Sequence, residues 1–130
     1  MILLDTHVVI WLALSPEKIS AKAHTAIAET RTKSAGLAIS DITLWEIAAG
    51  AHKQRIHLDT TFESFLSEVE SRFIVLPITA QIAVRAFSLS AAYPRDPADR
   101  MLAATALVHG IPLLTADSNI RRSKQVATIW

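Results

Sequence analysis

The chain has 130 residues, of which 51% are hydrophobic and 19% charged, and its formal net charge at pH 7 is +1. This composition is typical of a folded domain with a hydrophobic core, and the small net charge excludes a strongly basic protein that coats nucleic acid. The absence of cysteine excludes disulfides, thiolate catalysis and zinc–thiolate sites.

The amino-terminal segment is apolar but is interrupted by Asp5 and His7. Residues 2–4 form a continuous apolar run that predicts a buried parallel strand, and residues 6–14 predict a helix. The run over residues 8–14 is too short to cross a bilayer, and the segment lacks the basic flank and cleavage site of a signal peptide. We therefore expect a cytoplasmic protein with no membrane segment, formed by a single domain over residues 1–130.

The rest of the chain alternates between helical patterns and short apolar runs. Helices are expected over residues 20–32, 43–52, 61–72, 79–92 and 97–109, with a short one after residue 117. Strands are expected over residues 37–39, 73–78, 113–114 and 126–129. This alternation predicts an α/β fold with a mostly parallel central sheet and helices on both faces.

Four acids lie where the expected strands give way to helices. Asp5 and Asp117 end strands, whereas Glu46 and Asp99 fall in the first turn of a following helix. A parallel sheet brings such positions to the edge where its ligands bind. Carboxylates gathered there raise each other's pKa, and a divalent cation removes that cost. The pattern therefore predicts a Mg²⁺ or Mn²⁺ site suited to phosphoryl chemistry.

Each acid also fits a purely structural position at the start of a helix. Asp5, Asp96 and Asp117 stand where N-cap residues stand. Thr43 and Glu46 have the spacing of a capping box. Helix capping and metal binding are compatible roles for these acids, because the amino ends of helices lower the cost of gathering negative charge.

Several stretches together resemble the PIN-domain ribonucleases, and especially the VapC-type toxins of type II toxin–antitoxin pairs. The matching stretches run from one end of the chain to the other: LLDTHVVIWL, SDITLWEIA, RDPADRMLAATAL, PLLTAD and the closing ATIW. The resemblance implies a three-layer α/β/α sandwich and hydrolysis of RNA phosphodiester bonds that depends on Mg²⁺ or Mn²⁺. It also implies an RNA substrate, a homodimer and a cognate antitoxin as partners.

The resemblance assigns the catalytic and metal-binding residues motif by motif. They are Asp5 from LLDTH, Glu46 from LWEIA, Asp99 from DPADR and Asp117 from LLTAD. Two hydroxyls are expected to support them: Thr115 would orient Asp117 or a bound water, and Thr6 is a similar candidate beside Asp5. Asp96 is expected first as a helix cap and second as an outer acid of the site.

Most of the basic and aromatic residues have two interpretations. Arg100, Arg121 and Arg122 are candidate RNA contacts, and a solvated surface is the alternative for Arg121 and Arg122. The polar connection over residues 52–57 is expected to be a solvated rim, with contact to RNA phosphates as the alternative. Trp11 and Trp45 are expected in the core or at a subunit interface, and stacking on RNA bases is the second possibility.

Two other functions compete with the nuclease. A catalytically silent scaffold with the same fold would bind only RNA or a protein, but such sites usually lose an acid, and all four are present. A phosphoaspartate protein needs a second Asp two residues after the first in its phosphatase form, and that position is His7. The receiver-domain form needs an acidic pair after the first strand, where only Asp5 stands.

Overall fold

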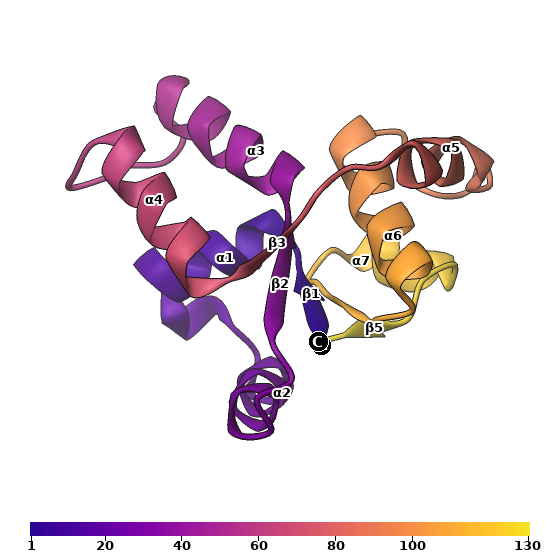
Figure 1. Cartoon of the computed structure of the whole chain (residues 1–130), viewed down its shortest axis with the longest axis horizontal. Coiled ribbons are helices and arrows are strands. Elements are labelled where there is room, and N and C mark those ends of the chain that lie inside the picture. Colours follow the sequence, from indigo (N-terminus) through magenta and orange to yellow (C-terminus); the bar gives the residue numbers. More distant parts are fainter.

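In the computed structural model, which describes all 130 residues, a five-stranded sheet lies between two layers of helices (Figure 1). The strands are β1 (Ile2–Leu4), β2 (Leu37–Ser40), β3 (Ile74–Leu76), β4 (Leu113–Leu114) and β5 (Thr128–Ile129). Their order in the sheet is β3-β2-β1-β4-β5, and every neighbouring pair is parallel. The α/β class and the three-layer arrangement expected from the sequence are confirmed.

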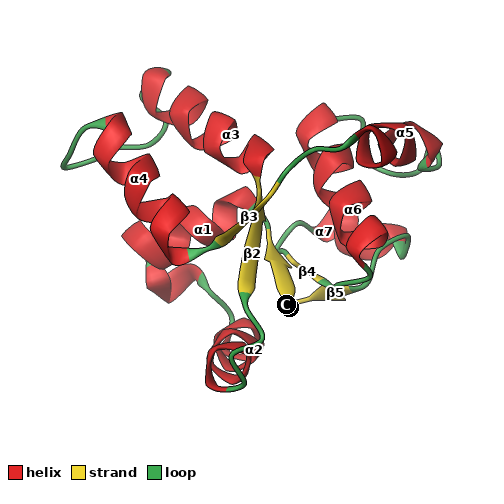
Figure 2. Ribbon diagram, viewed as in Figure 1, coloured by secondary structure: helices red, strands yellow, loops and turns green.

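The helices divide between the two faces of the sheet in chain order (Figure 2). One face carries α1 (Thr6–Leu14), α2 (Ala21–Thr32), α3 (Asp41–His52) and α4 (Phe62–Arg72), with a short 3₁₀ turn at Pro16–Lys18. The other face carries α6 (Pro97–His109) and α7 (Ser118–Ser123), and α5 (Ala80–Ser88) packs against α6. No helix combines the length and the apolarity that a membrane crossing requires.

The central strand β1 shows why these short apolar runs form strands. Successive side chains of a strand point to opposite faces, so Leu4 packs in one buried cluster with Val8, and Leu3 packs in the other with Leu102. All three residues of β1 are buried. A parallel strand covered on both faces therefore appears in the sequence as an unbroken apolar run.

The order in which strands are added to the sheet reverses at β1, and this reversal positions the acids. The chain adds β2 on one side of β1 and β4 on the other, so the connections after β1 and β4 diverge beyond their carboxyl ends. The amide of Asp5 donates a 3.0 Å hydrogen bond to the carbonyl of Leu114, which extends the pairing to the last residue before α1. Such a reversal is where doubly wound sheets bind their ligands.

Two helices differ from the sequence-based expectation for identifiable reasons. Helix α3 begins at Asp41 rather than Thr43, because Ser40 at the end of β2 accepts a 3.2 Å hydrogen bond from the amide of Ile42 and acts as the N-cap. Helix α5 ends at Ser88 rather than at residue 92, because Leu89 has extended backbone angles. The strand expected over residues 73–78 is shorter, at Ile74–Leu76.

Candidate active site

Asp5 lies at the carboxyl end of β1 and is only 6% exposed. It occupies the N-cap position of α1, as the sequence indicated, but its side chain makes no capping hydrogen bond. Its Oδ2 instead accepts a 2.7 Å hydrogen bond from the hydroxyl of Thr115, at the end of β4. The carboxylate of Asp5 is thus held by the neighbouring strand and not by its own helix.

Glu46 is held by a hydroxyl from α1. Thr6 donates a 2.6 Å hydrogen bond to Oε1 of Glu46, and its oxygen also lies 3.1 Å from the hydroxyl of Thr43. The capping box expected between Thr43 and Glu46 is wrong, since α3 starts earlier and Glu46 lies beyond its first turn. Thr6 is placed as the sequence suggested, in contact with an acid of the site.

Asp99 is positioned by the start of α6. Asp96 accepts a 3.1 Å hydrogen bond from the amide of Asp99, with Pro97 in the first turn, which confirms the expected helix cap. The side chain of Asp96 is exposed, whereas Asp99 is partly buried. The capping bond uses the backbone of Asp99, so its carboxylate remains available to the pocket.

Arg100, the residue after Asp99, binds protein backbone. Its guanidinium donates to carbonyls 3.2–3.4 Å away in the last turn of α5 and the segment after it, those of Ala86, Leu89, Ser90 and Tyr93. The hydroxyl of Tyr93 in turn donates a 3.2 Å hydrogen bond to the carbonyl of Asp99. These contacts fasten the segment after α5 to the first turn of α6, and an RNA contact by Arg100 stays a prediction.

Asp117 both caps a helix and faces the site. Its Oδ1 accepts from the amides of Asn119 at 2.8 Å and Ile120 at 3.0 Å, which confirms the expected cap of α7. The amide of Asp117 donates a 3.1 Å hydrogen bond to the hydroxyl of Thr115. Thr115 therefore orients the backbone of Asp117 and the carboxylate of Asp5, whereas the sequence pointed only to Asp117 or a water.

Three of the four acids have a raised pKa, and neighbouring carboxylates contribute to each of these shifts, which places the four acids close together. The pKa of Asp99 rises to about 7, chiefly because of burial and then because of Asp96, Asp5, Asp117 and Glu46. Burial also raises the pKa of Asp5, and Asp117 adds to this effect, while the hydrogen bond from Thr115 opposes it. The pKa of Glu46 is raised by burial and by Asp5, against the hydrogen bond from Thr6. The structure thus brings together the four acids that the sequence pointed to.

No basic side chain neutralises this pocket by pairing. The only ion pair in the structure joins Arg72 and Glu68 on α4. His7 is the one nearby base that lowers the pKa of Asp5 and Glu46, and its effect is smaller than that of burial. No three acidic or histidine side chains already converge as ligands of a single ion. The donor set nevertheless fits Mg²⁺ or Mn²⁺, because it consists of carboxylate oxygens without thiolate or imidazole pairs.

Two residues of the site were not identified from the sequence. Thr43 is fully buried and completes the hydroxyl pair with Thr6. Tyr93 is 1% exposed, and its pKa is raised by burial and then by Asp99, Asp5 and Asp117, so it lies near the acids. Thr43 could have been identified from its position three residues before Glu46. Tyr93 lies in an irregular segment, where the sequence gives no pattern that indicates a role in the site.

The candidate RNA contacts on α7 lie close to Asp117 in the chain. Arg121 and Arg122 are both exposed. Arg122 donates a 2.6 Å hydrogen bond to the side chain of Asn119, and Arg121 makes no side-chain hydrogen bond. Both guanidinium groups are therefore accessible to solvent, and their contact with RNA stays a prediction.

A parallel α/β/α fold with acids gathered beyond β1 and β4 is the architecture that the sequence motifs pointed to. The family model described as "PIN domain" matches residues 2–125. The chain therefore belongs to the PIN-domain family.

The chain is also similar to individual proteins of known identity or structure. The chain is 34% identical over 131 residues to Ribonuclease VapC22 of Mycobacterium tuberculosis, covering 99% of this chain and 98% of that protein. It is similar to a chain in a toxin–antitoxin complex from Klebsiella pneumoniae, with 27% identity, a TM-score of 0.62, and coverage of 91% and 88% of the two chains. Its fold also matches a chain in the structure of VapBC2 from Rickettsia felis bound to a promoter DNA fragment. That match has a TM-score of 0.73 and 19% identity, and covers 98% of this chain and 97% of the other.

Proposed function

We propose that this protein is a metal-dependent endoribonuclease that hydrolyses RNA phosphodiester bonds and acts as the toxin of a toxin–antitoxin pair. The observation that carries the proposal is the pocket that gathers Asp5, Glu46, Asp99 and Asp117, where neighbouring carboxylates raise the pKa of Asp5, Glu46 and Asp99 and no ion pair neutralises them. Membership of the PIN-domain family and the 34% identity to Ribonuclease VapC22 support the same activity.

The four acids are the proposed ligands of Mg²⁺ or Mn²⁺. When bound, such an ion supplies positive charge to the scissile phosphate and to the leaving oxygen of an in-line displacement, and it makes water more acidic. The chain supplies the rigid placement of the ligands: Thr115 fixes Asp5, and Thr6 fixes Glu46. Hydroxyls that orient carboxylate ligands in this way commonly tune a metal site.

The remaining residues hold the site together and receive the substrate. Arg100 and Tyr93 lock the backbone around Asp99, so its carboxylate enters the pocket from a fixed helix end. Arg121 and Arg122 are proposed to contact RNA phosphates beside Asp117, as exposed guanidinium groups close to the acids. Asp96 is a cap first, and its exposed carboxylate is a secondary acid at the rim.

The partners follow from the same proposal. We infer a cognate antitoxin that restrains the nuclease, which the likeness to a chain of the Klebsiella pneumoniae toxin–antitoxin complex supports. A homodimer and a cytoplasmic location belong to the proposal as well, the latter because the RNA substrate is found there. A native mass measurement of the purified chain, with and without a co-expressed antitoxin, tests both assemblies.

The activity is tested by incubating the purified protein with total RNA and Mn²⁺, with and without excess chelator, and mapping the cut ends. Discrete cut sites that disappear with chelator are expected. Cleavage that persists in chelator would contradict the metal-dependent mechanism. RNA binding without any cleavage would instead identify a catalytically silent scaffold.

A further inference from the structure

A groove extends from the acidic pocket along the outside of α1 and α3. It has a volume of about 810 Å³. Glu46, Thr6 and Asp96 line the end at the acids, and Lys53, Arg55 and Lys18 line the rest. The groove is therefore continuous with the candidate active site, and its character changes from acidic to basic along its length.

Helical spacing explains how α1 and α3 form the floor. Residues three or four apart lie on the same side of a helix. His7, Trp11 and Leu14 follow this spacing on α1, and Trp45 and Ala49 follow it on α3. Two helical stripes that run side by side thus produce one elongated floor.

The segment after α3 folds back to form the basic wall. The amides of Arg55 and Ile56 both donate to the carbonyl of Gly50, at 2.8 and 3.3 Å. A methyl group at Gly50 would come within 2.6 Å of Cδ1 of Ile56, so the side chain of Ile56 packs closely over Gly50 in this return. This return places Lys53 and Arg55 at the groove.

The basic side chains of the groove are not paired with acids. Lys18, Lys53 and Arg55 are exposed, and none of them forms an ion pair. Lys18 lies with its Nζ 5.9 Å from the centre of the Trp11 ring. Unpaired cations along a groove favour a polyanionic ligand, because binding releases the ligand's counterions.

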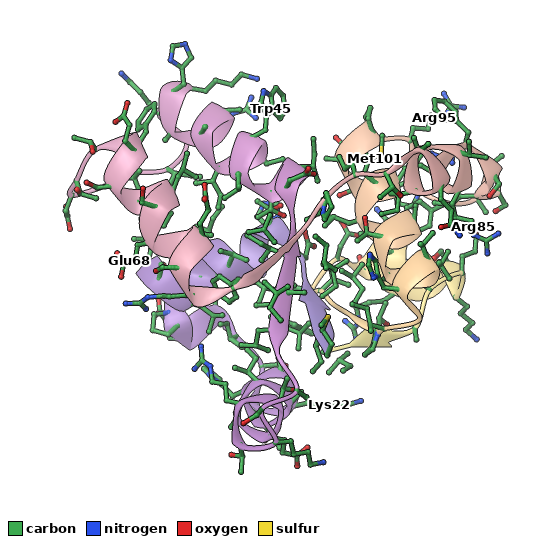
Figure 3. The ribbon with its side chains drawn as sticks, viewed as in Figure 1. Lys22, Trp45, Glu68, Arg85, Arg95 and Met101 are labelled. Carbon is green, nitrogen blue, oxygen red and sulfur yellow. The ribbon has the colours of Figure 1, made fainter.

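Trp45 gives the groove an exposed aromatic surface. It is 65% exposed, which excludes the core position expected from the sequence. Figure 3 shows it projecting from the outer side of α3, next in sequence to Glu46. An aromatic ring beside a basic groove is the arrangement on which unpaired nucleic-acid bases stack.

We propose that this groove binds a single-stranded RNA segment that flanks the scissile phosphate, with a base stacked on Trp45 and phosphates on Lys53 and Arg55. The proposal rests on the proposed nuclease function, since it gives the substrate a path away from the acids. A protein segment is the weaker fit, because a groove meant for an apolar partner has no need of three unpaired cations. Paired RNA is excluded from Trp45 because its bases are already stacked in the duplex.

Binding is measured by fluorescence anisotropy with a labelled single-stranded RNA of about 12 nucleotides. All variants carry Asp5→Asn, so that the RNA stays intact, and the matching chains with Asp5 are assayed for cleavage in parallel. The groove pair Lys53→Ala/Arg55→Ala is compared with Lys22→Ala/Arg85→Ala, which removes two exposed cations from α2 and α5 outside the groove (Figure 3). Trp45→Leu is compared with Trp45→Phe.

Lys53→Ala/Arg55→Ala should weaken RNA binding about tenfold and reduce the magnitude of the slope of log K against log salt by about 1.4. Lys22→Ala/Arg85→Ala should change neither the affinity nor the slope. Trp45→Leu should weaken binding of the single strand about tenfold, Trp45→Phe should restore most of it, and binding of a duplex of the same sequence should be insensitive to either. Equal effects of the two cation pairs, or of the two Trp45 variants, would overturn the proposal.

The two proposals fail in different ways. If the chains with Asp5 cleave RNA and the groove variants bind and cleave like the parent, the groove is not an RNA site, and a protein segment becomes its occupant. If no chain cleaves RNA but the groove variants lose binding, the nuclease function is wrong and the RNA groove is upheld. Failure of the parent to bind RNA overturns the groove proposal outright.

Discussion

The hydroxyl of Thr115 donates a 2.7 Å hydrogen bond to Oδ2 of Asp5, across 110 residues of sequence. Both residues are buried, and the same Thr115 oxygen accepts from the amide of Asp117. One hydroxyl therefore links the ends of β1 and β4 and sets the position of two acids of the site.

Replacing Thr115 with valine should lower both stability and activity. Valine keeps the shape but leaves Asp5 and the amide of Asp117 without their partner, which costs about 2 kcal/mol in the free energy of unfolding. Loss of orientation at Asp5 should reduce RNA cleavage at least about tenfold. Urea unfolding and single-turnover cleavage measure the two effects. Thr115→Ser retains the hydroxyl and should keep both the stability and the cleavage rate. Equal losses in the valine and serine variants would show that the hydroxyl does not account for them.

Removing the Arg100 side chain should destabilise the protein. In Arg100→Ala, up to four backbone carbonyls lose a charged donor, and we expect a loss of about 2–3 kcal/mol in urea unfolding. Arg100→Lys should not restore the loss, because an ammonium group lacks the planar fork that reaches several carbonyls. An unchanged unfolding midpoint together with a smaller salt dependence of RNA binding would assign Arg100 to the substrate instead.

Divalent metal should stabilise the folded protein. At a Mn²⁺ concentration of about 100 times Kd, binding to the folded state alone adds about 2.7 kcal/mol to the free energy of unfolding. Thermal unfolding and calorimetry detect this gain, which Asp5→Asn should reduce sharply. Asp59→Asn removes an exposed carboxylate outside the site and should leave the gain intact. Identical gains in the two variants would place the metal elsewhere.

Without metal, stability should fall as pH rises from about 4 to 7. The pKa of Asp99 in the folded protein is about 7, above its value in the unfolded chain, so the folded state binds more protons across this window. Raised pKa values of Asp5 and Glu46 act in the same direction. Asp99 is partly exposed, so solvent limits its share to about 1 kcal/mol.

Asp99→Asn should flatten this pH dependence. The amide carries no charge at any pH, so the variant should gain stability over the parent at about pH 7.5 and none at about pH 4. Thermal unfolding in chelator across this range measures the difference. A parent protein that becomes more stable with rising pH would contradict the raised pKa of Asp99.

The strands and the position of the acids could be predicted because the relevant signals are local. A buried parallel strand such as β1 is an apolar run, and an acid at its end must lie at the carboxyl edge of the sheet. The helix caps of Asp96 and Asp117 also depend only on neighbouring amides, and the structure confirms both.

The supporting contacts could not be predicted because they join distant segments. Glu46 is bonded to Thr6, 40 residues away, while its spacing from Thr43 suggested a local capping box. The capping box does not form because Ser40 caps α3 and the helix starts before Thr43. Tyr93 is buried in an irregular segment whose carbonyls are bound by Arg100, and no periodic pattern in the sequence reveals this arrangement.

Substitution of Asp5 by asparagine is the most direct test of whether the acidic pocket is the catalytic site. Asparagine keeps the shape and can still accept the hydrogen bond from Thr115, so the fold should be preserved. With Mn²⁺ and an RNA that the parent cleaves, Asp5→Asn should show no cleavage above the level in chelator, and in chelator it should unfold cooperatively with a midpoint no lower than that of the parent. Full cleavage by the folded variant would contradict the assignment of Asp5 and its neighbouring acids as the catalytic site.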